Sequence, residues 1–136
     1  GRARMLAVTH RPPADDVRPD APVHLVTGRV LQHYQSGAQT RRVPALAAAS
    51  PGGFVELHPD LAARLDVTDG DLVAVRSSRG TATAPARVTD SIRPDTVFMP
   101  FHWSGPANPN AVTNDALDPT SRMPELKVCA VEVSRA

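Results

Sequence analysis

The chain has 136 residues, of which 41% are hydrophobic and 21% charged, and its net charge is +1. This length suits one domain with its own hydrophobic core, and the composition excludes a disordered chain. No apolar run approaches the ~20 residues of a membrane-spanning helix, and so small a net charge gives no indication of nucleic-acid binding. The single cysteine excludes a disulfide framework, and because Cys129 lies in the apolar run VCAVEV we expect it in the core.

Residues 1–22 are predicted to be an extended crossing between domains, and residues 23–136 to be the domain itself. Residues 4–10 (RMLAVTH) have the composition of a short strand. Residues 10–22 contain four prolines and three aspartates, and proline both fixes φ and removes a hydrogen-bond donor. The chain begins with Gly1 and shows no signal peptide, so we expect a domain taken from a longer protein.

The remaining residues predict a mainly β domain with one or two short helices. One helix is expected at residues 45–49, and another has Pro59 in its first turn and covers residues 61–65. Strands are expected at residues 24–30, 53–58, 72–78, 81–90, 97–103 and 125–133. Pro85 predicts that its strand lies at a sheet edge or contains a bulge. Short strands separated by turns, with a long loop at residues 104–124, favour a small β-barrel.

The sequence lacks the common catalytic motifs. There is no G-x-S-x-G nucleophile turn and no G-x-x-x-x-G-K phosphate loop. The five histidines, at positions 10, 24, 33, 58 and 102, lack the spacing of a zinc site. Asp66, Asp69 and Asp71 surround Gly70, where a turn with local backbone hydrogen bonds is expected. We therefore predict neither catalytic residues nor a metal site in this chain.

A first polar cluster follows the strand expected at residues 24–30. Gly28 would let the backbone approach a ligand closely, and Arg29 offers a planar fork that suits a phosphate or a heterocycle edge. Neutral donors and acceptors and further cations follow it: His33, Gln35, Ser36, Thr40, Arg41 and Arg42. The mixture is typical of a site for a polar, planar ligand that carries phosphate. A solvated loop whose arginines pair with surface acids explains the same residues equally well.

A second polar cluster lies far along the chain, and it contains His102, Trp103, Asn110, Thr113, Glu125 and Lys127. Lys127 is the only lysine among fifteen basic residues. A lone lysine that enters a strand usually protects a sheet edge from pairing. Here it follows Pro124 and Glu125, so its backbone is restrained and its ammonium group can be aimed at a ligand.

Together the two clusters resemble a known family. The sequence contains TGR-x-x-x-HYQSGAQTRR, then FVELHPDLAARL-x-V-x-DGD-x-V-x-V-x-S-x-RG, then VFMPFHW, and finally NAVTNDALDPTSRMPELKVCAVEV. In this order they are similar to the C-terminal dinucleotide-binding domain of bacterial molybdopterin oxidoreductases, over residues 4–133. The resemblance implies a double-psi β-barrel of the aspartate decarboxylase-like type. It also implies a bis(molybdopterin guanine dinucleotide) cofactor with molybdenum.

The resemblance assigns roles to residues at matching positions. Thr27, Gly28 and Arg29 match the turn that contacts the cofactor, and Asn110 matches the asparagine of an N-x-[LV]-T element. Leu126, through its backbone, and Lys127, through its ammonium group, match a P-E-[LFY]-K element. The loop beside the pterin and phosphates is matched by His33, Gln35, Ser36 and Thr40. Arg41 and His102 are second candidates that could instead be structural.

The same resemblance predicts the function. HYQSGAQTRRV, the HW pair and LDPTSRMPELK are most similar to assimilatory nitrate reductase, which reduces nitrate to nitrite. The implied partners are the other domains of the catalytic chain, with an iron–sulfur cluster, and an electron-donor protein; the implied compartment is the cytoplasm. Alone, this domain is expected to catalyse nothing, because the cofactor carries the chemistry.

Three alternatives remain open at this point. The chain could belong to a formate dehydrogenase, because the molybdenum pocket that selects the substrate lies in other domains. It could be a separate molybdopterin-binding subunit, as in enzymes of the formylmethanofuran dehydrogenase type. It could also be a double-psi barrel that binds another protein and no cofactor.

Overall fold

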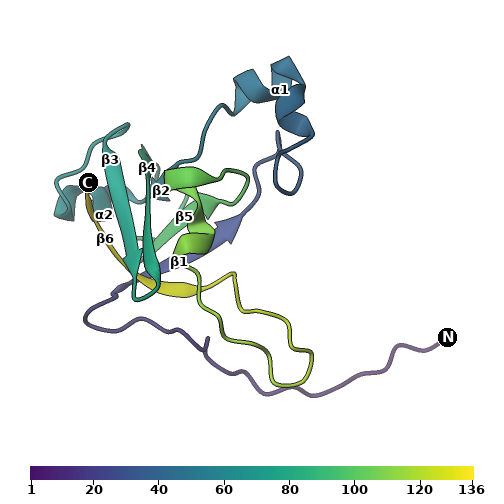
Figure 1. Cartoon of the computed structure of the whole chain (residues 1–136). Coiled ribbons are helices and arrows are strands. Elements are labelled where there is room, and N and C mark those ends of the chain that lie inside the picture. Colours follow the sequence, from purple (N-terminus) through teal and green to yellow (C-terminus); the bar gives the residue numbers. More distant parts are fainter.

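A computed structural model describes residues 1–136, with a closed barrel of six strands at its centre (Figure 1). The strands are β1 (Val23–Gly28), β2 (Val55–Leu57), β3 (Leu72–Ser77), β4 (Gly80–Val88), β5 (Thr96–Pro100) and β6 (Cys129–Arg135). Around the barrel they follow the order β1-β5-β2-β4-β3-β6, in which β1–β5 and β2–β4 are parallel pairs. The prediction of a mainly β, double-psi barrel is confirmed.

The helices are short and lie outside the barrel. They are α1 (Pro44–Ala49) and α2 (Pro59–Arg64), with three 3₁₀ turns, η1 (Thr40–Arg42), η2 (Gly105–Ala107) and η3 (Pro109–Ala111). Helix α2 has Pro59 in its first turn, as predicted, and the His58 ring accepts a hydrogen bond from the Asp60 N–H. No helix is long and apolar enough to cross a membrane.

Alternating side chains of the strands fill the barrel. In β1 every second residue is buried, and Leu25 is fully covered. Facing side chains from the other strands, also without exposed surface, include Val55, Leu57, Val73, Val75, Val97, Met99 and Val131. Cys129 is buried among them, as expected from its apolar run. Burial of each such side chain contributes roughly 1.5–3 kcal/mol to the free energy of folding. The packed barrel is therefore a rigid support for the loops that it carries.

Two predicted strands differ from the structure at their ends. Residues 4–10 form no strand and are exposed, because no other strand lies beside them to supply hydrogen-bond partners. The last strand begins at Cys129 rather than at residue 125. The preceding backbone carbonyls of Glu125 and Val128 instead accept hydrogen bonds from the Asn114 side chain.

The edge position offered for Pro85 is wrong, because a closed barrel has no edge for it to occupy, whereas the alternative of a bulge stays a prediction. Residues 80–85 of β4 pair with β3, and residues 86–88 pair with β2. Pro85 is the last residue paired with β3, opposite Leu72. A residue without an N–H is tolerated there because the strand changes partner immediately after it.

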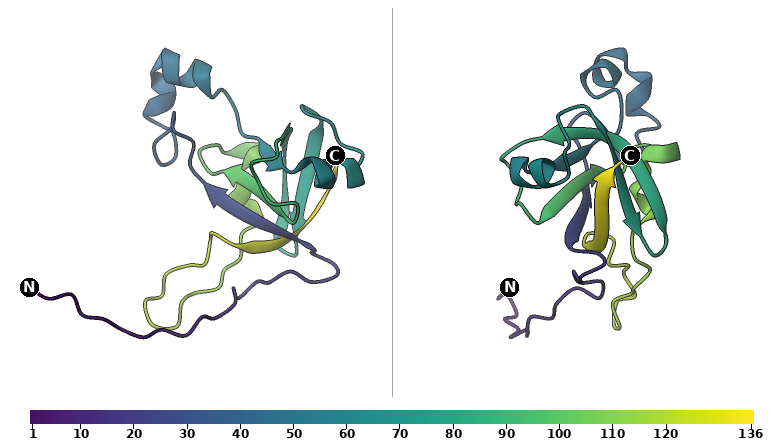
Figure 2. Two further views of the ribbon diagram at one scale, coloured as in Figure 1. Left: turned by 180° about the vertical axis from the view of Figure 1, so that it is seen from behind. Right: turned by 90° about the vertical axis from the view of Figure 1, so that its left-hand side faces the viewer.

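Two extended segments project from the same side of the barrel (Figures 1 and 2). The upper arm is residues 29–53, which carry η1 and α1, and the lower arm is residues 114–128, the yellow-green loop. Helix α1 has no buried residue, so it is not held by packing against the barrel. The arms depend instead on hydrogen bonds near their bases.

His102 attaches the upper arm to the barrel. Its ring is 1% exposed; Nε2 accepts from the Val30 N–H at 2.9 Å, and Nδ1 donates to the carbonyl of Gln35. The Arg41 guanidinium also donates to the carbonyl of His102 and, at 2.9 Å, to that of Ser36. Because Nε2 must accept a hydrogen bond, the ring is neutral in this arrangement.

Burial is the main cause that lowers the pKa of His102, and the neighbouring charges on His33, Arg29 and Arg41 lower it further. The hydrogen bond to Gln35 opposes this shift only in part. The folded chain therefore resists protonation at position 102.

Asn114 holds the lower arm at its base. Its side chain is buried, and Nδ2 donates to the carbonyls of Glu125 at 2.9 Å and Val128 at 3.0 Å. Its Oδ1 accepts from the Ala116 N–H at 2.9 Å. One amide thus fixes both ends of the arm.

We predict that the chain becomes less stable as the pH falls below about 6.5. The unfolded chain then gains a proton at position 102, which the folded chain does not bind, so the free energy of unfolding decreases. Urea unfolding of the wild type at pH 7.5 and 5.5 measures this. In His102→Gln the free energy of unfolding should fall less between these two pH values than in the wild type. In His10→Gln, which changes the exposed N-terminal segment, it should fall as much as in the wild type. An equal loss in His102→Gln and the wild type would contradict the assignment.

We predict that Asn114→Ala lowers the free energy of unfolding by about 1–3 kcal/mol, because two partly buried carbonyls lose their donor. Asn110→Ala is the matched control, since its exposed side chain makes no hydrogen bond within the chain. Its effect should stay within about 0.5 kcal/mol. Urea unfolding of both variants at pH 7.5 measures this difference. Equal free energies of unfolding would show that the Asn114 amide does not hold the lower arm.

Candidate functional site

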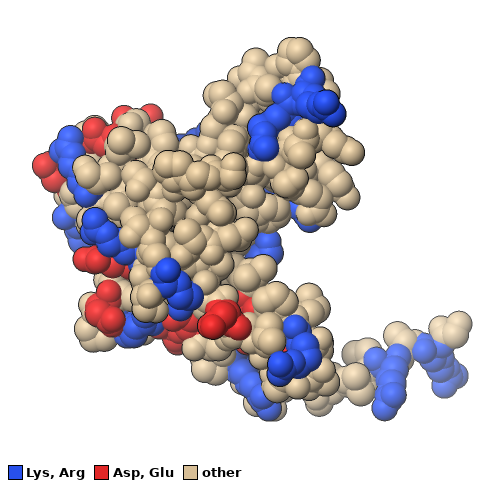
Figure 3. All heavy atoms as spheres, in the orientation of Figure 1, with Lys and Arg blue, Asp and Glu red and all other residues tan.

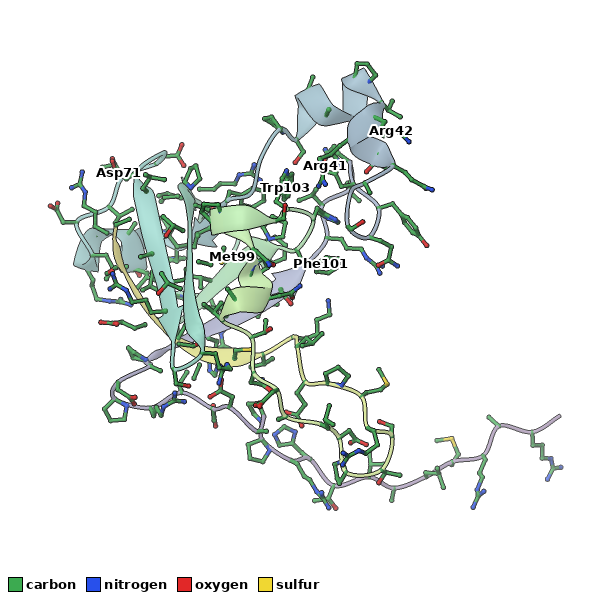
Figure 4. All side chains as sticks on the ribbon, in the orientation of Figure 1. Arg41, Arg42, Asp71, Met99, Phe101 and Trp103 are labelled. Atoms are coloured by element: carbon green, nitrogen blue, oxygen red, sulfur yellow. The ribbon has the colours of Figure 1, made fainter.

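The space between the two arms is a hollow with Phe101 at its inner wall (Figure 4). Strand β5 ends at Pro100, and the chain then turns, with the Phe101 N–H donating to the Gly28 carbonyl at 3.1 Å. This bond places the aromatic ring beside the end of β1. Figure 3 shows the hollow between the two lobes of the surface, with atoms of Lys or Arg at its inner wall.

Two cations lie against the same ring. The Arg29 guanidinium carbon is 5.7 Å from the Phe101 ring centre, and the Lys127 Nζ is 5.0 Å from it. No carboxylate lies within 4.0 Å of either cation, although seven ion pairs exist elsewhere in the chain. Two like charges held together without a counterion produce a positive potential, so this part of the hollow favours an anionic ligand.

Backbone contacts between the two polar clusters fix these cations. The Thr27 hydroxyl donates to the Leu126 carbonyl at 2.9 Å, and Lys127 Nζ donates to the Thr27 carbonyl at 3.2 Å. Five of the predicted residues, Thr27, Gly28, Arg29, Leu126 and Lys127, thus come together although about a hundred positions separate the two groups.

A smaller hollow of about 310 Å³ adjoins Phe101. It brings Ser36 of the upper arm and Asn110 of η3 to one surface, together with Arg41, His102 and Trp103. Trp103 Nε1 is buried and has no hydrogen-bond partner, which is rare for a buried donor. The hollow therefore joins residues from both clusters, and one of its lining residues has a buried N–H without an acceptor.

His33 and Thr40 do not line the smaller hollow. His33 is buried, its Nε2 donates to the Ser50 carbonyl at 2.8 Å, and its Nδ1 is 3.0 Å from the Thr40 hydroxyl. Its ring meets Trp103 edge-on at 5.2 Å between centres. Both nitrogens are occupied within the chain, so His33 supports the upper arm, and contact with a ligand remains a prediction.

Gln35 and Gly28 have backbone roles. Gln35 adopts a positive φ of 50° and its side chain is exposed, while its carbonyl accepts from His102. A Cβ added at Gly28 would lie 2.6 Å from the Phe98 ring, so packing requires glycine at this position. Close approach of a ligand to the Gly28 backbone stays a prediction.

Sequence reasoning missed two parts of the site. Phe101 was taken as part of a strand over residues 97–103, although Pro100 marks where that strand ends. A third hollow, of about 480 Å³, is lined by Arg29 together with Phe54, Arg87 and Phe98. There the Arg87 guanidinium stacks at 3.6 Å over Phe54, which neighbours Phe98. Nothing in the spacing of these residues indicates that they meet.

Comparison with known sequences gives relatives over almost the whole chain. The assimilatory nitrate reductase catalytic subunit of Bacillus subtilis is 42% identical over 134 residues, which are 97% of this chain and 19% of that protein. The F420-dependent formate dehydrogenase subunit alpha of Methanocaldococcus jannaschii is 46% identical over 135 residues, 99% of this chain and 20% of that protein. The chain therefore spans about a fifth of the length of these curated relatives.

Among solved structures, acetylene hydratase from Pelobacter acetylenicus matches with a TM-score of 0.73 at 21% sequence identity. The match covers 85% of this chain and 18% of the hydratase, and at this identity it shows a common fold. The family model described as "Molydopterin dinucleotide binding domain" matches residues 23–130. The chain belongs to this family of molybdopterin dinucleotide-binding domains.

Proposed function

We propose that this chain holds bis(molybdopterin guanine dinucleotide) in the hollow between its arms, as the cofactor-binding domain of a molybdenum-dependent nitrate reductase. The observation that carries the proposal is the pair of cations, Arg29 and Lys127, on Phe101 without a carboxylate partner. Each half of such a cofactor joins a pterin to guanosine through a pyrophosphate, and a pyrophosphate requires cations.

The residues of the site fit the chemistry of this ligand. Arg29 and Lys127 match phosphate oxygens, to which Arg binds through its fork and Lys as a compact charge. The exposed amide of Asn110 matches the polar edges of the fused rings. The buried, neutral His102 and the hydrogen-bonded Thr27 keep the surrounding loops fixed, so the donors are oriented before the ligand arrives.

In the proposed enzyme the bound cofactor supplies the molybdenum at which nitrate loses an oxygen atom to become nitrite. The chain itself binds and orients the dinucleotide, covers its polar groups and surrounds it with fixed dipoles. Residues of other domains select the substrate, with an iron–sulfur cluster there and an electron-donor protein as further parts of the proposal. We propose the cytoplasm as its compartment, in keeping with an assimilatory role.

Formate oxidation is the second candidate, because the formate dehydrogenase of Methanocaldococcus jannaschii is 46% identical to this chain. The residues of the chain do not distinguish the two reactions.

We predict that Arg29→Ala and Lys127→Ala each weaken the binding of guanosine diphosphate, a probe with the nucleotide and pyrophosphate of the cofactor. Losing one charged hydrogen-bond donor corresponds to about a tenfold or larger rise in Kd. Titration calorimetry of the 136-residue chain at low salt measures it. Arg64→Ala, on α2, is the charge-matched control and should leave Kd unchanged.

Cytidine diphosphate and inorganic pyrophosphate serve as comparison ligands in the same titrations. The guanine form of the cofactor predicts that guanosine diphosphate binds more tightly than either. Equal effects of Arg64→Ala and Lys127→Ala would contradict the assignment of the site.

The proposed reaction is tested with the complete enzyme that contains this chain. We predict that it reduces nitrate to nitrite with reduced viologen as the electron source, and that Lys127→Ala lowers its content of bound molybdenum. Metal analysis of the purified protein gives the second readout without an activity assay. Formate-dependent viologen reduction in place of nitrate reduction would favour the second candidate.

A further inference from the structure

Asp15 lies in the N-terminal segment, outside residues 23–130 that match the family, yet it is among the better covered carboxylates of the chain. Its side chain is 12% exposed and accepts three hydrogen bonds. The donors are Arg18 at 2.8 Å, Arg79 at 2.7 Å and the backbone N–H of Ala130 at 3.2 Å. A segment expected to be a crossing between domains is thus tied to the barrel at this residue.

Arg79 extends the link to the loop that carries Asn110. It lies in the turn between β3 and β4, and its Nε and Nη2 donate to the Val112 carbonyl at 3.3 and 3.0 Å. The same Nη2 donates to Asp15. Val112 is two residues from Asn110, so the Asp15–Arg79 pair fixes the backbone next to one predicted ligand contact.

Ala130 extends the link to Lys127, which is three residues away. Beside this contact, the Ala14 N–H donates to the Glu125 carboxylate at 2.9 Å. The N-terminal segment and the lower arm accordingly run side by side in both views (Figures 1 and 2). Asn110 and Lys127 of the second polar cluster are therefore each held, within two or three residues, by contacts that involve Asp15.

The charge of Asp15 is maintained at neutral pH. Burial alone raises the pKa of its carboxyl group, but the hydrogen bonds from Arg18, Arg79 and Ala130 together outweigh burial and hold the pKa below its usual range. Hydrogen bonds to an ionised carboxylate are stronger than those between neutral groups. The Asp15–Arg79 pair is also partly shielded from water.

We infer that Asp15 is a positioning residue of the proposed dinucleotide site: through Arg79 and the Ala130 N–H it holds the lower arm where Lys127 faces Phe101. This inference rests on the proposed function for the ligand, but the linkage of the N-terminal segment to the arm stands on the contacts alone. If Asp15 only stabilised the fold, its substitution would lower the free energy of unfolding, and its effect on Kd would not depend on whether Lys127 is present.

The test uses the 136-residue chain with guanosine diphosphate as the probe. Asp15→Asn keeps the size of the side chain and removes its charge; Asp15→Glu keeps the charge. Asp16→Asn is the matched control, because that neighbouring exposed carboxylate accepts from the adjacent Val17 N–H and reaches no part of the arm through its side chain. Calorimetry gives Kd, and amide hydrogen exchange reports on residues 112–130.

We expect Asp15→Asn to raise Kd about two- to tenfold and to speed exchange at Ala130, with Asp16→Asn unchanged and Asp15→Glu partly restored. In a Lys127→Ala background, Asp15→Asn should raise Kd by a smaller factor than in the wild type, since part of its effect passes through Lys127. Additive losses, or an unchanged Kd in Asp15→Asn, would overturn the inference.

If the wild type fails to bind guanosine diphosphate, the proposed function fails. Amide hydrogen exchange alone then tests whether Asp15 holds the lower arm. Faster exchange over residues 112–130 in Asp15→Asn, with none in Asp16→Asn, supports the hold on the arm. Unchanged exchange rejects it.

Discussion

The position of β1 in the closed barrel is the constraint on which the site depends. It pairs with β5 along its whole length, from His24 opposite Thr96 to Gly28 opposite Pro100, and with the start of β6 through Val23, His24 and Leu25. The residues that follow β1 and β5, and those that precede β6, must therefore lie close together. This is why Arg29, Phe101 and Lys127, which come from three distant parts of the sequence, form one surface.

The site combines a rigid base with two exposed arms. The base is the barrel, whose inward-facing side chains are fully buried, whereas α1 in the upper arm has no buried residue. Each arm is held by a few polar side chains, His102 and Arg41 for the upper arm and Asn114 and Asp15 for the lower arm. Of these four residues, His102 and Asn114 are buried. Buried polar groups are costly unless fully bonded, so such anchors specify one position for each arm. A ligand that needs several charges and amide edges at fixed places benefits from this arrangement.

Much of this could be predicted from the sequence, for identifiable reasons. The fold followed from short strands bounded by turns and from the order of four motifs. The meeting of Thr27 with Leu126 and Lys127 was expected from the family pattern and is present in the structure. Other features depend on contacts that spacing does not reveal. Asp15 and Ala130 are 115 residues apart, and only the path of the folded chain brings them together. Pro85 was misjudged because a local rule for edge strands does not anticipate barrel closure.

The histidines show the same limit within one small region. The ring nitrogens of His33 and His102 have partners within the chain, which their polar surroundings in the sequence do not reveal, and contact of either residue with a ligand stays a prediction. The central claim is that the hollow between the arms receives the pyrophosphate of the dinucleotide at Arg29 and Lys127. An experimental structure of the complete enzyme with its cofactor tests this most directly. The account predicts phosphate oxygens within hydrogen-bond distance of both side chains, beside Phe101. A cofactor bound on another face of the barrel, with Arg29 and Lys127 in solvent, would contradict it.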